Sequence, residues 1–128
     1  AVGVGAGLGG CVRSDFVVVG ERSYAPRERS HVVDVYLPVD APVVVHKQVE
    51  DARALGELPA SEVIGRIDVE GDPRAGWGAV FAEARHRARR LGGDAIVVRA
   101  WDRPLAKVTG RGKARYGKSV VLEVHRYE

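Results

Sequence analysis

The fold is decided by residues 77–98, which read WGAVFAEARHRARRLGGDAIVV. Apolar side chains recur there at i, i+3, i+4, i+7, i+11 and i+14, a spacing that covers about 100° of one helix face. These positions are Trp77, Val80, Phe81, Ala84, Ala88 and Leu91. Gly92 suits the left-handed residue after a helix, Gly93 allows a sharp reversal, and Asp94 can bond backbone groups of the turn. Because Ala95–Trp101 is rich in β-formers, the stretch predicts a helix that turns directly into a strand.

Two further segments around the helix have the character of strands. Before it, Val63–Val69 is mostly apolar, and Gly71-Asp72-Pro73 ends it. After it, Ser119–Tyr127 alternates at period two, which is typical of a half-buried strand. These elements predict a β-α-β-β unit over residues 63–127, with a right-handed crossover if its first two strands are parallel. The predicted fold class is α+β, a small mixed sheet with one main helix packed on one face.

One or two strands are expected before this unit. Residues 31–37 (HVVDVYL) predict a strand that Pro38 closes. The apolar run at 43–46, after Pro42, predicts another strand. Residues 48–59 predict a short helical turn and a loop, because Gly56 and Pro59 interrupt them.

The 128 residues suit one domain, which we expect over residues 32–128. Residues 12–31 are predicted to be a tether or an irregular connecting segment. Residues 1–11 are predicted to be the tail of a signal peptide and its lipobox. The absence of methionine leads us to expect a processed N-terminus or a start inside the reading frame.

The single cysteine, Cys11, carries the main functional signal. It ends Leu8-Gly9-Gly10-Cys11, which has the form of a lipobox behind a small apolar run. In a lipobox, small residues before the cysteine let the scissile bond enter the narrow active site of the enzyme that cleaves lipoprotein signals. The thiol of the cysteine carries the diacylglycerol. The pattern predicts lipidation of Cys11. The alternative is an ordinary glycine-rich terminus in which a cysteine occurs by chance.

The positive charge is concentrated in the C-terminal part. Residues 77–128 carry twelve basic and five acidic side chains, whereas residues 32–76 carry four basic and nine acidic ones. Residues 103–118 contain no acidic side chain, and Tyr116 among them could stack on a base. The candidate anion-binding residues are Arg103, Lys107, Arg111, Lys113, Arg115 and Lys118. The opposing interpretation is a solvated basic loop in a chain rich in arginine.

No pattern predicts catalysis, a cofactor or a metal. Residues 5–10 match G-x-G-x-x-G, but a dinucleotide site needs a strand before the motif and a helix after it. Residues 112–119 (GKARYGKS) match a phosphate-binding loop, but a strand pattern follows where that loop needs a helix. No two of the four histidines have metal-ligand spacing. The expectation is therefore a protein that is not an enzyme.

Two short motifs resemble small bacterial envelope proteins. Residues 62–67 (EVIGRI) are similar to the "evIGxI" strand of these proteins, and residues 88–97 (ARRLGGDAIV) to their "A-x-x-lGaDAvi" helix end and strand. The resemblance is to the YbjQ-type heavy-metal-binding family and to the outer-membrane stress-sensor lipoprotein of the Rcs phosphorelay. It implies the fold and an envelope setting. The disulfide-dependent signalling of the sensor is not implied, since a single cysteine forms no disulfide within the chain. A metal site is not implied either.

These observations predict a non-enzymatic, lipid-anchored protein of the bacterial envelope, facing the periplasm, with a structural, sensing or scaffold role. Its expected partners are the membrane, through Cys11, and an envelope protein or anionic headgroups. The alternative is a cytoplasmic anion- or nucleic-acid-binding module that uses the basic loop at 103–118.

Overall fold

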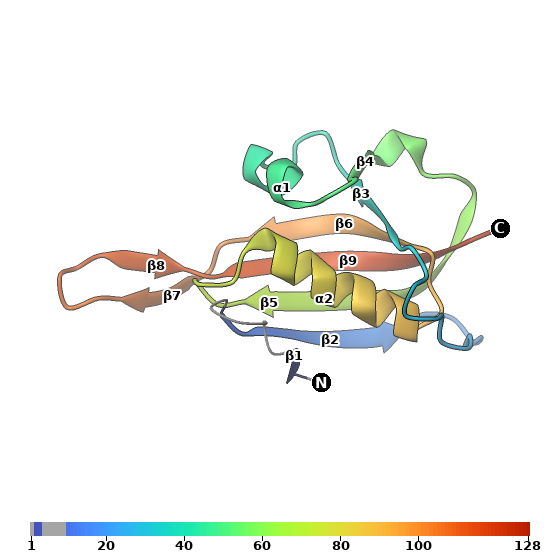
Figure 1. Ribbon diagram of the computed structural model, residues 1–128, viewed down its shortest axis with the longest axis horizontal. Coiled ribbons are helices and arrows are strands. Elements are labelled where there is room, and N and C mark those ends of the chain that lie inside the picture. The colour runs from blue at the N-terminus through green and yellow to red at the C-terminus, as the bar shows by residue number, and fades with distance from the viewer. Residues whose placement is uncertain (1, 4–9) are drawn as a thin grey trace.

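The computed structural model describes residues 2–3 and 10–128. Figure 1 shows one long helix across a sheet and a hairpin that projects from one end of it. The main sheet contains β1 (Val2–Gly3), β2 (Val12–Val18), β3 (Asp34–Leu37), β4 (Arg53–Ala54), β5 (Ser61–Gly71), β6 (Ala95–Asp102) and β9 (Lys118–Tyr127). The projecting hairpin contains β7 (Leu105–Val108) and β8 (Ala114–Tyr116). The helices are α1 (Val43–Gln48), α2 (Trp77–Arg90) and a 3-10 turn, η1 (Leu55–Glu57).

The sheet is mixed, and the α+β prediction is confirmed. Its strand order is β1-β2-β5-β9-β6-β3-β4. β5 and β6 are both antiparallel to β9, which lies between them, so they run in the same direction. The predicted β-α-β-β unit is therefore present, with β9 inserted between the two strands that α2 connects.

The predicted apolar stripe of α2 is the centre of the core. Trp77, Val80, Phe81, Ala84 and Ala88 are buried, and Leu91 packs beside them. They meet the inward residues of the sheet, including Ile67 on β5 and Leu122 on β9. Figure 1 shows α2 crossing this face of the sheet.

The turn after α2 has the predicted backbone. Gly92 lies at φ 85°, in the left-handed region that a side chain disfavours. A Cβ on Gly93 would lie 2.3 Å from Cγ1 of Val124, so the helix end can approach β9 only with glycine there. Both glycines thus have a folding role, as the sequence indicated.

The prediction of a strand at 43–46 is wrong, because Val43–Gln48 forms α1. The Pro42 carbonyl accepts hydrogen bonds from the backbone N–H groups of Val45 and His46, which starts a helical turn. Only Val45 of the three valines is buried, while Val43 and Val44 stay exposed. Packing of one residue therefore overrides the β preference of a valine run.

The prediction of a tether or connecting segment at 12–31 is wrong for its first part. Residues 12–18 form β2, which pairs with β5 from Val12–Gly71 to Val18–Gly65. Val12 and Ser14 are buried beneath α2. Because one inward position is a serine, the sequence lacks the apolar alternation that predicts a half-buried strand. Residues 19–31 contain no helix or strand, as predicted.

Candidate functional site

Cys11 lies immediately before β2, and its side chain is exposed with a free thiol. Its backbone is fixed by Asp72, which follows β5. The Cys11 N–H donates to Oδ2 of Asp72 at 2.8 Å, and the Cys11 carbonyl accepts from the Asp72 N–H at 3.0 Å. Gly10 is also constrained, since a Cβ there would lie 1.5 Å from Oδ1 of Asp72. The contact with Asp72 therefore explains the glycine at position 10 independently of a lipobox. Leu8 and Gly9 of the predicted lipobox lie outside the described residues.

Asp72 acts as the local cap of this region. Besides Cys11, the backbone N–H groups of Arg74 and Ala75 donate to Oδ1, at 2.9 and 3.1 Å. The hydrogen bond from Cys11 is the main cause that lowers the pKa of Asp72, with further lowering from Arg74 and Ala75 against an opposing effect of burial. The carboxylate is thus ionised, and both of its oxygens accept hydrogen bonds from backbone N–H groups.

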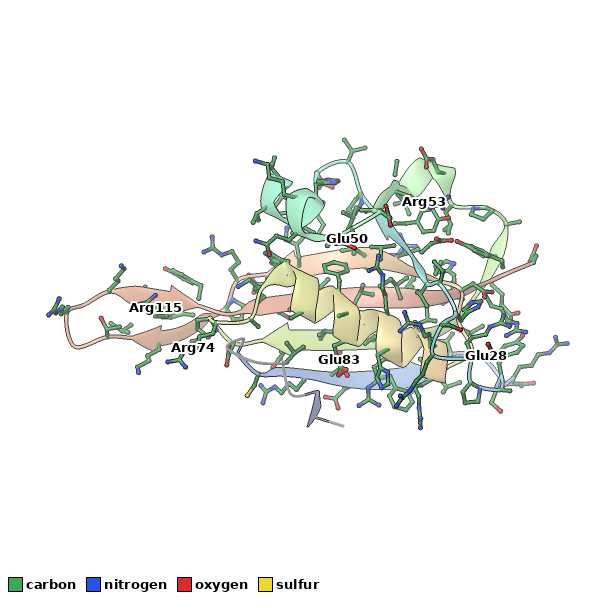
Figure 2. All side chains as sticks on the ribbon, in the orientation of Figure 1. Glu28, Glu50, Arg53, Arg74, Glu83 and Arg115 are labelled. Carbon is green, nitrogen blue, oxygen red and sulfur yellow. The ribbon has the colours of Figure 1, made fainter. Side chains whose placement is uncertain are left out.

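Two adjoining clefts open around Cys11, with volumes of about 570 and 660 Å³. Both are lined by Cys11, Asp72, Pro73 and Ala106. The first extends along the base of the hairpin to Leu105 and Lys118. The second lies between the Arg74 turn and the hairpin and reaches Lys107 and Arg115. Figure 2 shows Arg74 and Arg115 near each other at this end of the molecule.

Cations dominate the second cleft. The side chains of Arg74, Lys107 and Arg115 make no hydrogen bond or ion pair with any described residue. At the hairpin base, burial lowers the pKa of Lys118, as does the charge of Arg103, and Asp72 opposes both. The charge of Arg74 also lowers the pKa of Asp72, the one carboxylate in the described lining of this cleft. An anion bound here would meet the donors of Lys107 and Arg115 and the charge of Arg74, so the region is suited to anion binding.

The predicted anion-binding residues are distributed over the whole hairpin. Lys107 and Arg115 lie directly opposite each other in the β7–β8 register. Arg103 lies over the ring of Tyr116, 5.4 Å from its centroid. Arg111 and Lys113 are exposed in the connecting turn. Lys118 begins β9 beside the first cleft.

Sequence reasoning missed Arg74, which faces the cleft from a turn far away in the sequence. The only local signal was the Asp72-Pro73 turn before it, which places a residue at the end of β5.

Asp94 organises the opposite end of the molecule. It is 7% exposed, and its Oδ2 accepts the Tyr127 N–H at 2.9 Å. His31 Nε2 lies 2.7 Å from Oδ1, and Arg27 forms an ion pair at 3.1 Å. Burial would raise the pKa of Asp94, but these three partners lower it overall. The predicted folding role is thus present, although Asp94 bonds distant segments instead of its own turn.

A second buried polar chain surrounds His125, which is 5% exposed. Ser61 Oγ lies 2.8 Å from its Nδ1, and Oε1 of Glu123 lies 3.2 Å from its Nε2. Burial would raise the pKa of Glu123, but hydrogen bonds from Arg99 and His125 lower it. Each ring nitrogen therefore has a partner, as a buried histidine requires.

No helix in residues 2–3 and 10–128 has the length and apolarity to cross a membrane. Within the same residues, no three side chains of His, Cys, Asp or Glu are grouped to hold a metal. Comparison with protein-family models, curated proteins and solved structures finds no match.

Proposed function

We propose that this protein is a non-enzymatic, lipid-anchored component of the bacterial envelope, held at the membrane through Cys11 and facing the periplasm in a structural, sensing or scaffold role. The observation that carries the proposal is the position of Cys11. Its side chain is exposed, and Cys11 lines both clefts at the hairpin end, including the one that Arg74, Lys107 and Arg115 also line. The resemblance of residues 62–67 and 88–97 to envelope proteins supports the same setting.

Cleavage before Cys11 is compatible with the fold. It would remove β1, a strand of two residues that pairs with the start of β2. The long pairing of β2 with β5 would remain. The nitrogen of Cys11 would stay within reach of Asp72, which already accepts its N–H. Several acyl chains on one cysteine would give stable anchoring, whereas a single chain gives only marginal binding.

The test is Cys11→Ser in cells, expressed with the natural upstream sequence, with Ser30→Ala as an exposed control. Membranes are washed at high salt, since salt screens attraction between a basic surface and anionic headgroups but leaves an acyl anchor in place. We expect wild type and control to stay with the membranes and Cys11→Ser to be released, and intact mass to show diacylglycerol on wild type and control but not on Cys11→Ser. Retention of Cys11→Ser, with no added mass on wild type, would refute the anchor.

The second candidate is a cytoplasmic anion- or nucleic-acid-binding module. The observation that favours it is the cationic cleft between Arg74 and the hairpin. Stacking of a base on Tyr116 is restricted, because Arg103 already lies over that ring. With about four phosphate contacts, binding to single-stranded DNA would have a log–log salt slope near −2.8. Submicromolar binding at physiological salt, lost in Tyr116→Ala, would favour this candidate over the anchor.

A further inference from the structure

The β7–β8 hairpin has two chemically different faces. Leu105 lies opposite Tyr116, Lys107 opposite Arg115, and Val108 opposite Ala114. The register shifts between Leu105 and Lys107, so one extra residue of β7 is accommodated as a bulge at Ala106. Opposite residues in an antiparallel pair share a face, and so do residues two apart in one strand. One face therefore carries Leu105, Val108, Ala114 and Tyr116, and the other carries Lys107 and Arg115.

The apolar face is largely exposed in the described structure, although Arg103 lies over the ring of Tyr116. Leu105 is 60% exposed, Val108 57% and Tyr116 45%. In Figure 1 the hairpin extends beyond the main sheet, so α2 does not cover it. A grouped exposed apolar surface on a projecting element indicates a binding surface more often than scattered single residues do.

The basic face is unfavourable in isolation. Lys107 and Arg115 are like charges directly opposite each other, an arrangement that destabilises a strand pair. No acidic residue occurs at 103–118 to relieve it. Arg74 adds a third cation across the cleft. A bound anion would remove this repulsion, so the face is suited to phosphate groups.

A partner that binds both faces must present apolar groups and phosphates within the width of one hairpin. The interface of an anionic bilayer offers both, since acyl chains begin directly below the headgroups, and tyrosine is favoured at that depth. Lysine and arginine can extend past the edges of a two-stranded ribbon to reach phosphates. Nucleic acid offers phosphates but leaves Leu105 and Val108 in water.

We propose that the β7–β8 hairpin is a membrane-contacting element, which places its apolar face in the interface of a bilayer containing anionic phospholipid and its cations on the headgroup phosphates. The inference rests on the proposed function for the presence of a membrane at this end. It deepens that function, because lipid on Cys11 would enter the same bilayer that the hairpin contacts. A second membrane signal beside the acyl chains would fix the orientation of the domain.

The test uses purified full-length Cys11→Ser protein, which carries no lipid, and measures sedimentation with vesicles. The vesicles are phosphatidylcholine alone or equal parts phosphatidylcholine and phosphatidylglycerol. We expect binding to the anionic vesicles that weakens with salt, and little binding to the neutral ones. Lys107→Ala with Arg115→Ala should weaken it about 25-fold, because each cation near an anionic surface contributes about fivefold. The matched control is Arg22→Ala with Arg29→Ala, the same charge change in the segment around Glu28 at the other end of the molecule (Figure 2).

The apolar face has its own variant, Leu105→Ser with Val108→Ser, which changes no charge. It should weaken vesicle binding at least tenfold, since more than one apolar side chain leaves the interface. Its control is Val32→Ser with Val39→Ser, two valines that are 73% and 97% exposed elsewhere. Thermal midpoints within the error of Cys11→Ser verify that each variant is folded.

Three results would overturn the inference. One is equal weakening by the hairpin variants and their controls. Another is no binding to anionic vesicles. The third is binding to single-stranded DNA or polyglutamate that equals vesicle binding and is unaffected by the apolar variant. Because the tested protein lacks the thiol, these outcomes are independent of the acylation test: absence of lipid on wild type would refute the anchor and leave the hairpin result standing.

Discussion

Asp94 offers the sharpest test of how the domain is held together. Its carboxylate joins three segments that are distant in sequence, through Arg27, His31 and the backbone of Tyr127. We predict that Asp94→Ala destabilises the protein by about 3 kcal/mol, and Asp94→Asn by about 1–2 kcal/mol. The amide of asparagine keeps one acceptor oxygen, so it should retain part of the network.

The magnitude follows from which partners can return to water. Loss of one member of a buried pair costs about 3–5 kcal/mol when the other charge stays buried. The side chains of Arg27 and His31 are 29% and 33% exposed, so both can be solvated again. The Tyr127 N–H, whose bond to Asp94 is part-buried, is left without this acceptor, which costs about 1–3 kcal/mol. The lower end of the range for a buried pair is therefore expected.

The assay is equilibrium unfolding in urea, with the midpoint and the slope fitted separately. The control is Asp68→Asn, the same change at a carboxylate that is 52% exposed and forms a surface ion pair with Arg66. It should change stability by less than about 1 kcal/mol, as surface ion pairs do. A loss below about 1 kcal/mol for Asp94→Ala, with an unchanged slope, would refute the reasoning.

The lowered pKa of Asp94 also predicts a pH dependence. In the unfolded chain an aspartate titrates near 3.9, and the folded pKa is lower. The folded state therefore gains stability that is complete well above pH 4 and is lost as the pH falls through the folded pKa. Asp94→Asn removes this contribution, so its stability should fall less steeply than that of wild type below about pH 4. An identical acid dependence in the two proteins would contradict the low pKa.

Two further predictions test the packing around α2. Phe81→Ala should lower the free energy of unfolding by about 3–5 kcal/mol, because Phe81 is 1% exposed. The same change at Phe16, which is 46% exposed, should cost less than half as much. Equal losses in denaturant unfolding would mean that the buried face of α2 is misassigned. Gly92→Ala should lower the free energy of unfolding by about 2 kcal/mol, since φ is +85° and the new Cβ would lie 2.7 Å from Cβ of Tyr24. The control Gly110→Ala should be nearly neutral, because its Cβ meets nothing within 4 Å. A neutral Gly92→Ala in thermal unfolding would exclude the strained turn.

The parts of the fold that were predictable are those whose signals are local. The apolar stripe of α2 and the Gly92 cap lie within one continuous stretch and agree with each other. β9 was predictable because it alternates along its length. Residues 43–46 were misassigned because their conformation depends on the helical turn that starts at Pro42 and on the burial of Val45. β2 was missed because its second inward residue is Ser14, whose partners Glu83 and Arg87 lie on α2.

The candidate site likewise has features that the sequence predicts and features that depend on long-range pairing. The cations of the hairpin could be identified from sequence, because no acidic residue interrupts them. Their arrangement could not, since it depends on a bulge that only the pairing reveals. The contact between Cys11 and Asp72 spans 61 positions, and Arg74 enters the cleft through the same turn. Long-range pairing of this kind leaves no periodic signal in the chain.

An arginine-rich composition accounts for the abundance of cations but not for their separation into faces. Without the bulge at Ala106, Leu105 and Lys107 would be two apart in a regular strand and would share a face. Both faces of the hairpin would then be mixed, and neither would suit an apolar partner. The register instead collects the exposed apolar residues on one side and opposes two like charges on the other. Opposed like charges destabilise a strand pair, and a grouped exposed apolar surface is typical of a binding surface, so both features favour a hairpin that acts by contact with a partner.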